Sequence, residues 1–318
     1  MSGAPLLEVR GLRVAYGALR AVDGVDLAVE AGEVFGFLGP NGAGKSTTVR
    51  MLTTLLRPTG GSARVAGLDV VDDAAAIRRR IGVALQDAAI DPLMTGNELL
   101  RLQAVLHGLS RRTVKTRCAD LLERVGLTAA GDRRVGTYSG GMRRRLDLAL
   151  SLVHEPEILF LDEPTTGLDP TSRMALWEEV RHLNTDLGTT VFLTTQYLEE
   201  ADALADRIAI IDGGTIVREG EPTALKSAVG APTLRVEVAE SQLDAARAVM
   251  VGFGAERPAR QGRVAIGLEA GTAGVSAVLV ALGDAAVDVH HVELDEPSLD
   301  DVFADATGRR LEGGETDS

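Results

Sequence analysis

Apolar positions along the chain follow two spacings, and the order in which they alternate predicts the fold. Short continuous apolar runs, typical of strands buried on both faces, occupy residues 34–38, 81–85, 158–161 and 190–195. Apolar residues at helical spacing fill the longer stretches 44–56, 95–127, 142–152, 171–187 and 198–205. Because such strands and helices take turns along the chain, we expect an α/β fold with a largely parallel core sheet.

Looser β-patterns flank this core. Residues 6–29 alternate between apolar and polar side chains and predict β-structure ahead of the first core strand. After the last core helix, strands at 207–211 and 215–218 meet at Asp212-Gly213-Gly214, which is a hairpin signal.

A break near residues 229–232 separates a second pattern. Strands and helices are predicted there at residues 234–238, 243–251, 263–268, 275–282 and 287–294, before a last helix that begins at Ser298. We therefore expect one domain over residues 1–230 and a small α+β accessory domain over 231–308. The polar residues 309–318 predict a disordered tail.

Length, charge and cysteine content limit the function classes. The 318 residues, 45% of them hydrophobic, suffice for about two domains with a core. A net charge of −13 argues against nucleic-acid binding through a broad basic surface. No apolar run approaches the ~18 residues that a membrane helix needs, and no secretory signal is evident, so we expect a cytosolic or membrane-peripheral protein. The single cysteine, Cys118, excludes an internal disulfide, and we expect it to be a buried structural thiol.

A glycine-rich loop follows the first core strand. Its sequence, Gly39-Pro40-Asn41-Gly42-Ala43-Gly44-Lys45-Ser46-Thr47, fits the phosphate-loop pattern G-x-x-x-x-G-K-[ST] at every position. Its glycines let backbone N–H groups point at a phosphate, and the following helix adds positive potential at its N-terminus. We expect Lys45 to reach the β- and γ-phosphates and Ser46 to ligate Mg²⁺. The alternative, a glycine-rich turn before an ordinary helix, is disfavoured because strand, loop and helix follow in the required order.

Two acidic residues stand at the end of the apolar run 158–161. Ligands gather at the carboxyl ends of buried parallel strands, so Asp162 is a candidate for holding Mg²⁺, directly or through water. Glu163 is a candidate general base that polarises the attacking water. An acidic pair after a strand is more often a loop feature, but the phosphate loop in the same chain favours the catalytic interpretation.

A second predicted anion site lies upstream, in Tyr138-Ser139-Gly140-Gly141-Met142. A serine and two glycines at a helix start direct unpaired N–H groups and the helix dipole at one point. Because one triphosphate needs only one such nest, the second suggests a γ-phosphate contacted from a different molecule.

Together with Gly167-Leu168-Asp169-Pro170, these motifs resemble the ATP-binding cassette of ABC transporters over residues 6–220. The resemblance implies the P-loop NTPase cassette fold, with an antiparallel β subdomain and a helical subdomain at about residues 87–155. It also implies a head-to-tail dimer of two copies, in which each ATP lies between one copy's phosphate loop and the other copy's signature serine.

The resemblance also implies roles for individual residues. Gln86 would contact Mg²⁺ and the attacking water, and Asp169 would link the two sites across the dimer. Tyr16 would stack on adenine, although an exposed strand tyrosine is the alternative. The residues that would bind the partner's ATP are Ser139, Gly140 and Gly141.

Two residues depart from the family's usual pattern. Met142 stands where the signature usually has glutamine, and Gln196 stands where a switch histidine usually follows the last core strand. Glutamine can donate to the γ-phosphate but cannot take up a proton or carry charge. We therefore expect slow but real hydrolysis with Glu163 as the base.

The departures narrow the resemblance. Residues 138–149, 193–202 and 299–303 are similar to the daunorubicin/doxorubicin-resistance type of exporter ATPase, which implies a separate membrane permease and a peripheral location at the cytoplasmic face. A soluble ABC-type ATPase that acts on ribosomes or nucleic acid, and an ATP-switched binding protein, are the alternatives. For Arg143-Arg144-Arg145, contact with phosphate or the permease and a merely exposed helical face are equally compatible with the sequence.

Overall fold

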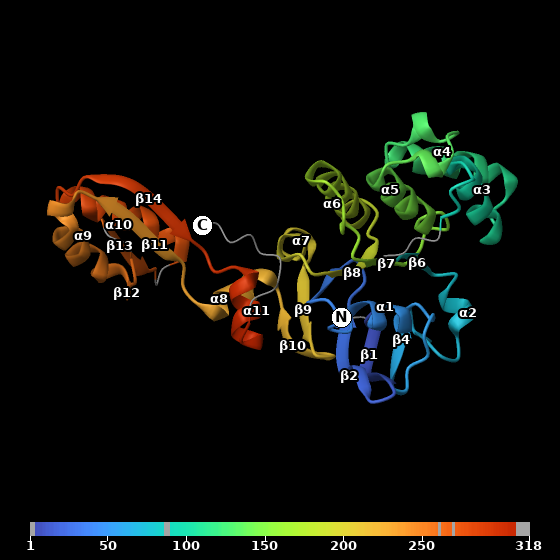
Figure 1. Cartoon of the computed structure of the whole chain (residues 1–318), viewed down its shortest axis with the longest axis horizontal. Helices are drawn as coiled ribbons and strands as arrows, with labels where there is room; N and C mark the ends of the chain where they lie inside the picture. Colours follow the sequence, from blue (N-terminus) through green and yellow to red (C-terminus); the bar gives the residue numbers. More distant parts are fainter. Residues whose placement is uncertain (1–3, 86–89, 260–261, 269–270, 310–318) are drawn as a thin grey trace. The chain divides into compact units, whose positions relative to one another are not determined.

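Strands buried on both faces form the centre of the first of two compact units. The computed structural model describes residues 4–85, 90–259, 262–268 and 271–309 (Figure 1). It places a six-stranded sheet in the order β10-β9-β3-β8-β7-β6, in which only β10 is antiparallel to its neighbour. The strands are β3 (Val34–Leu38), β6 (Ile81–Ala84), β7 (Ile158–Asp162), β8 (Thr190–Thr195), β9 (Arg207–Asp212) and β10 (Thr215–Gly220). This sheet confirms the predicted α/β class.

An aromatic cluster fixes the middle of this sheet. The ring of Phe192 on β8 lies 5.6 Å, between centroids, from each of Phe35, Phe37 and Phe160 on the two neighbouring strands. All four rings are fully buried. Rings at this separation stabilise one another beyond the area that they bury, so the relative register of β3, β7 and β8 is well determined.

A smaller antiparallel sheet shares this core. Its order is β2-β1-β4-β5, formed by β1 (Leu7–Tyr16), β2 (Leu19–Val29), β4 (Gly60–Val65) and β5 (Leu68–Asp69). Helix α1 (Lys45–Leu52) is buried among the apolar side chains of both sheets. The helix ends four residues before the predicted residue 56, because Thr54 takes a left-handed φ of 64° that a helix cannot continue through.

Helices make up the rest of the first unit. The stretch 95–127, predicted to be mostly helical, forms two helices, since the chain turns at Gly108 (φ 77°) and restarts with Ser110 as N-cap. Cys118, on the second of these helices, is buried, as expected. The helices of this unit are α2 (Ala74–Ile77), α3 (Gly96–Leu106), α4 (Arg111–Arg124), α5 (Gly140–Ser151), α6 (Pro170–Thr185) and α7 (Leu198–Leu204).

The second unit begins after Pro222, whereas the sequence placed the boundary after residue 230. It has a four-stranded antiparallel sheet in the order β12-β13-β11-β14, covered by two helices around their own apolar core. The element order β-α-β-β-α-β with this strand order is the ferredoxin-like split βαβ arrangement. Its elements are α8 (Pro222–Val229), β11 (Thr233–Val238), α9 (Leu243–Met250), β12 (Glu256–Arg257), β13 (Arg263–Gly267), α10 (Val275–Asp284), β14 (Val289–Asp295) and α11 (Leu299–Thr307).

The prediction from the apolar pattern missed the short helix α8, in which Leu225 is buried, and the strand β12, which is only two residues long. The predicted tail falls outside the described residues from residue 310 on. In the part of the chain that the structure describes, no helix is both long and apolar enough to cross a bilayer.

Candidate functional site

The phosphate loop leaves the carboxyl end of β3 and runs into α1. Two of its glycines are needed because other backbone lies against them. A Cβ on Gly39 would lie 2.3 Å from the carbonyl oxygen of Ile211, and one on Gly44 would lie 2.5 Å from that of Ala21. Gly44 also has a φ of 108°, where L side chains are strained. The loop is thereby pressed against the end of β9, with its N–H groups at the start of α1.

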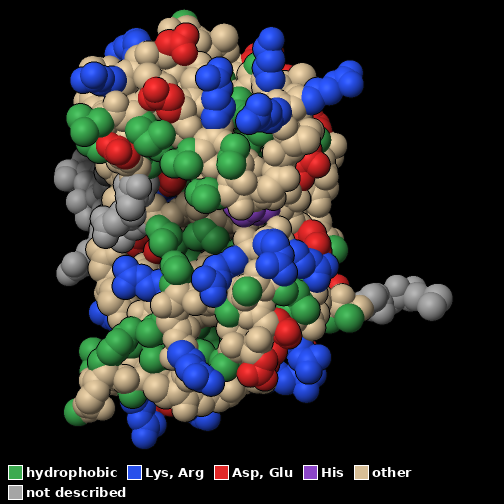
Figure 2. Space-filling model, turned by 90° about the vertical axis from the view of Figure 1, so that its right-hand side faces the viewer, with side chains coloured by type: hydrophobic (Ala, Val, Ile, Leu, Met, Phe, Trp, Pro, Cys, Tyr) green, Lys and Arg blue, Asp and Glu red, His purple; other side chains and the backbone are tan. Residues whose placement is uncertain are grey.

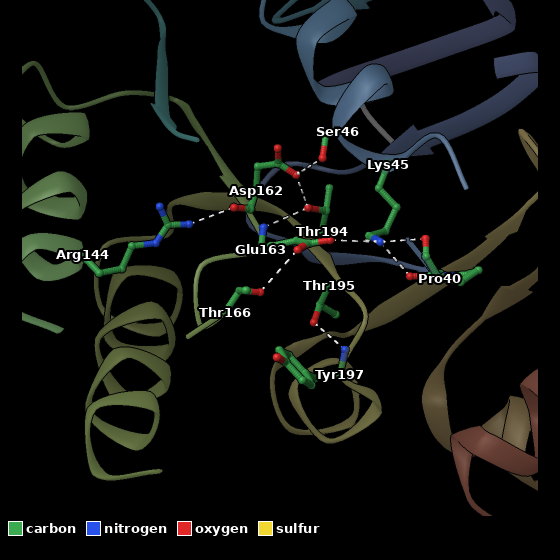
Figure 3. A network of polar contacts seen from close by, with 11 residues as sticks. Pro40, Lys45, Ser46, Arg144, Asp162, Glu163, Thr166, Thr194, Thr195 and Tyr197 are labelled. Atoms are coloured by element: carbon green, nitrogen blue, oxygen red, sulfur yellow. Dashed lines mark hydrogen bonds and ion pairs between the residues drawn. The ribbon is translucent and has the colours of Figure 1, made fainter. Parts of the chain in front are cut away.

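Lys45 is folded back over this loop. Its side chain is buried, and its Nζ donates hydrogen bonds to the carbonyl oxygens of Gly39 (2.7 Å) and Pro40 (3.0 Å). The same nitrogen lies 3.1 Å from Oε1 of Glu163 (Figure 3). The predicted phosphate-binding cation and the predicted general base therefore form a buried ion pair at the mouth of the loop.

Asp162, the last residue of β7, lies beside the start of α1. The Ser46 hydroxyl donates to its Oδ1 at 3.1 Å, and the Thr194 hydroxyl donates to the same oxygen at 2.6 Å (Figure 3). A hydroxyl and a carboxylate oxygen at this separation suit a hard cation such as Mg²⁺, which binds few protein oxygens and keeps several waters. The residues present therefore fit the magnesium site predicted for Ser46 and Asp162. Gln86, the third predicted ligand, lies outside the described residues.

Glu163 has an unusual backbone. Its φ is 48°, in the left-handed region, and its N–H donates to both the carbonyl and the hydroxyl of Thr194, each at 3.1 Å. Its side chain is 5% exposed, and Oε2 accepts a hydrogen bond from the Thr166 hydroxyl at 3.3 Å. A side chain with left-handed backbone persists where its surroundings hold it, and such residues are frequent at active sites.

Gln196 follows the carboxyl end of β8, the strand beside β7, and is half-buried. Its flanks are fixed: the N–H of Tyr197 donates to the Thr195 hydroxyl at 2.9 Å, and the Arg173 guanidinium lies 5.0 Å from the centre of the Tyr197 ring. Glu163 lies beside this strand end, because its N–H donates to Thr194 on β8 (Figure 3). The switch residue and the candidate base thus stand at the same edge of the sheet.

Glu200, on α7, was not singled out by the sequence. It is fully buried, its Oε1 accepts a hydrogen bond from the indole of Trp177 on α6 at 3.1 Å, and burial raises the pKa of its carboxyl group. In the sequence it follows another glutamate in the first turn of a helix, where acids are common at exposed positions. Nothing local therefore distinguished it.

The residues assigned to the partner's ATP lie at a helix start. Ser139 is exposed and caps α5, where its hydroxyl accepts the N–H of Met142 at 3.2 Å. A Cβ on Gly140 would meet nothing within 4 Å. The N-terminus of α5 is thus open to solvent at Ser139 and Gly140. Gly141 is buried, and a Cβ there would lie 2.7 Å from the hydroxyl oxygen of Ser172.

Asp169 and Tyr16 are also exposed. Asp169 caps α6 and accepts from the backbone N–H (3.0 Å) and hydroxyl (2.6 Å) of Ser172, and these bonds hold the pKa of its carboxyl group below its usual value. Tyr16 ends β1 with 52% of its surface exposed. The structure thus gathers Lys45, Ser46, Asp162 and Glu163 into one cluster, whereas Tyr16, Ser139 and Asp169 present surfaces to solvent.

A groove of about 620 Å³ lies elsewhere on the first unit, and Figure 2 shows a hollow with hydrophobic and histidine side chains on this face. The rings of His107 and His154, which line the groove, stack at 3.8 Å between centroids, and burial lowers the pKa of both. Asp147 also lines it, and burial raises the pKa of its carboxyl group to about 6. Leu55 and Leu102 add exposed apolar surface to the lining.

Comparison with known proteins gives one family. The family model described as ABC transporter matches residues 22–166. The daunorubicin/doxorubicin resistance ATP-binding protein DrrA of Streptomyces peucetius is 48% identical over 98% of this chain and 95% of its own length. The doxorubicin resistance ATP-binding protein DrrA of Mycobacterium tuberculosis is 44% identical over 93% and 91%. The linearmycin resistance ATP-binding protein LnrL of Bacillus subtilis is 36% identical over 96% and 99%.

Solved structures match about two thirds of the chain, which is close to the fraction that the first unit makes up. A dimeric ATP-binding cassette in a post-hydrolysis state, bound to ADP and Pi, superposes with a TM-score of 0.62 at 25% identity and covers 68% of this chain and 98% of its own. The cbiO1 subunit of an ABC transporter complex from Clostridium perfringens has a TM-score of 0.65 at 26% identity, covering 71% and 92%.

Proposed function

This chain belongs to the ATP-binding subunits of ABC transporters, and from that membership we propose that it hydrolyses ATP to drive export of a hydrophobic drug, antibiotic or lipid-like compound. The observation that carries the proposal is the cluster of four side chains at the phosphate loop. Ser46 is hydrogen-bonded to Asp162, and Lys45 forms an ion pair with Glu163. The resistance proteins named above supply the substrate class, because this chain matches them over nearly its whole length.

Each residue of the cluster has a distinct role. Lys45 exchanges its loop carbonyls for the β- and γ-phosphate oxygens, and the N–H groups of the loop and α1 bind the remaining phosphate charge. Ser46 and Asp162 would hold Mg²⁺, which would neutralise phosphate charge. Glu163 accepts the proton of the attacking water, and Gln196 donates a hydrogen bond to the γ-phosphate.

A second copy of the chain completes the site. ABC ATP-binding subunits dimerise, and a related cassette structure is a dimer. In the proposed dimer the open N-terminus of α5, with Ser139, Gly140 and Gly141, binds the γ-phosphate of the ATP held by the other copy. Asp169 lies between the two sites, and the exposed ring of Tyr16 stacks on adenine.

The membrane partner is a separate permease, which holds this chain at the cytoplasmic face. We propose that a segment of the permease binds in the groove of His107 and His154. Apolar side chains in this groove are exposed to solvent, Leu55 by 58% and Leu102 by 47%. Leu102→Glu is expected to abolish co-purification with the co-expressed permease while ATP binding persists. Val105→Glu is the control, since Val105 is 62% exposed on the same helix but does not line the groove.

The catalytic assignment is tested by steady-state ATP hydrolysis of the purified chain. Glu163→Gln is expected to lower kcat by about 10²–10⁴-fold, the usual range for removal of a general base, while ATP still binds. Lys45→Ala is expected to lose ATP binding itself. If Glu163→Gln turned over ATP at the wild-type rate, Glu163 would not be the base.

A further inference from the structure

Arg144 is the one member of the arginine triplet that reaches the catalytic strand end. It lies on α5 and only 11% of its side chain is exposed. Its guanidinium donates to three backbone carbonyls on two segments of the chain. Nη1 donates to Leu85 (2.6 Å), while Nη2 and Nε donate to Asp162 (2.8 Å) and Pro164 (2.8 Å). Figure 3 shows the bond to Asp162. The sequence left an exposed helical face open for this residue, and the structure overturns that alternative.

Two of these carbonyls flank the candidate base. Asp162 and Pro164 stand on either side of Glu163, whose left-handed φ of 48° must be held by its surroundings. The planar fork of a guanidinium has donors at fixed angles, so one side chain can hold both carbonyls at once. Relaxation of Glu163 to an ordinary backbone conformation would turn at least one of these carbonyls away from Arg144.

The guanidinium is itself held in place. Its Nη1 lies 3.3 Å from Oδ2 of Asp147, one turn further along α5. Burial lowers the pKa of Arg144 and raises the pKa of Asp147, so removing both charges from water opposes the attraction between them. A buried pair of this kind is weak evidence for stability. We therefore interpret the pair with Asp147 as holding the Arg144 guanidinium in position.

Ser139 and Arg144 share one rigid element. Arg144 lies five positions after Ser139, a rise of about 7.5 Å at 1.5 Å per residue. The open N-terminus of this helix is the proposed contact for the partner copy's ATP, and Arg144 holds the turn of the Glu163 in its own chain. A shift of α5 therefore moves both Ser139 at its N-terminus and the turn that contains Glu163.

We propose that Arg144 is a positioning residue through which the signature helix α5 sets the backbone of Glu163. Contact of Ser139 with the ATP of the partner copy then fixes the general base of its own copy, so each site is active when the other is engaged. The inference rests on the proposed head-to-tail dimer and adds a physical connection between its two sites.

The test compares Arg144→Lys with Arg145→Lys in the full-length chain. Arg145 is the matched control, because it lies on the same helix and donates to a single carbonyl, that of Val125, at 2.9 Å. Arg144→Lys is expected to lower kcat about 100-fold, as small misplacements of catalytic groups do, with KM for ATP and the thermal midpoint close to those of Arg145→Lys. Equal loss of kcat in both variants, or a kcat for Arg144→Lys within twofold of wild type, would overturn the inference.

Two further measurements separate positioning from folding. Guanidinium ion, added below denaturing concentrations, is expected to restore part of the kcat lost in Arg144→Ala and none of that lost in Arg145→Ala. In a double-mutant cycle with Ser139→Ala, the losses of kcat are expected to be less than multiplicative, since both act through α5. Fully multiplicative losses would show that α5 does not connect the sites. A wild-type chain without ATP hydrolysis would instead contradict the proposed function.

Discussion

Glu163→Gln should tighten ATP binding as well as slow hydrolysis, because Glu163 competes with phosphate for Lys45. The side chains of Glu163 and Lys45 are only 5% and 3% exposed, and their charged atoms lie 3.1 Å apart. Removing one partner of a buried ion pair costs about 3–5 kcal/mol, since the other charge is left uncompensated. We take the lower end, about 3 kcal/mol, because two loop carbonyls still accept from Nζ.

Phosphate oxygens supply the missing negative charge when ATP binds. Recovery of between half and all of the lost energy, about 1.5–3 kcal/mol, lowers the Kd for ATP by about 10- to 150-fold. The same variant without nucleotide should unfold at a lower urea concentration, and saturating ATP should remove most of the difference.

The assay is calorimetric titration with ATP in the presence of EDTA, so that neither protein hydrolyses its ligand, together with urea unfolding of both nucleotide-free proteins. Thr166→Ala is the control, since it removes only the 3.3 Å hydrogen bond to Oε2 and leaves the pair with Lys45 intact. If Glu163→Gln bound ATP with the wild-type Kd and unfolded at the wild-type urea midpoint, the ion pair would not oppose ATP binding.

Three further outcomes follow from the structure. Burial raises the pKa of Asp147 to about 6 from its ordinary 3.8, so the charged carboxylate destabilises the fold above pH 6, and this cost disappears as the pH falls toward 4. Asp147→Asn lacks this charge, so it should be more stable than wild type at pH 7. That advantage should shrink by about 3 kcal/mol between pH 7 and pH 4 in urea titrations. Gly39→Ala places a Cβ 2.3 Å from the carbonyl of Ile211, and we expect about 1–3 kcal/mol lower stability and weakened ATP binding by calorimetry. Trp177→Phe removes the donor to the buried Glu200 and should lower the free energy of unfolding by about 1–3 kcal/mol.

The phosphate loop and the strand ends could be predicted because their chemistry is local. Residues 39–47 must combine glycines, a lysine and a hydroxyl within one turn, and no tertiary contact is needed to see that combination. The apolar run before Asp162 likewise marks a buried strand by itself. Local pattern failed at residue 54, where the apolar spacing continues through Leu55 although the helix has ended and Leu55 is 58% exposed.

The roles of Arg144 and Glu200 could not be predicted, because their partners are distant in the sequence. Arg144 bonds to carbonyls 59, 18 and 20 residues away, and the indole that donates to Glu200 is 23 residues away. The local sequence of an arginine triplet, or of an acidic helix start, does not reveal whether its side chains are buried or exposed. Only the packing of α5 and α6 against the strand ends distinguishes these cases.

The contacts around Glu163 also indicate why one copy of the chain should hydrolyse ATP poorly. Its carboxylate is held by Lys45, and its backbone depends on a helix, α5, whose open N-terminus is the proposed contact for the other copy's nucleotide. Binding of ATP removes the first constraint, because the phosphate oxygens replace the Glu163 carboxylate as the partner of Lys45. The bonds from Arg144 already set this backbone in a single copy, and contact of Ser139 with a partner's nucleotide then fixes α5 and with it the general base. Two independent events are therefore needed for one turnover, and we expect the specific ATPase activity of the purified chain to rise with protein concentration until the dimer is saturated.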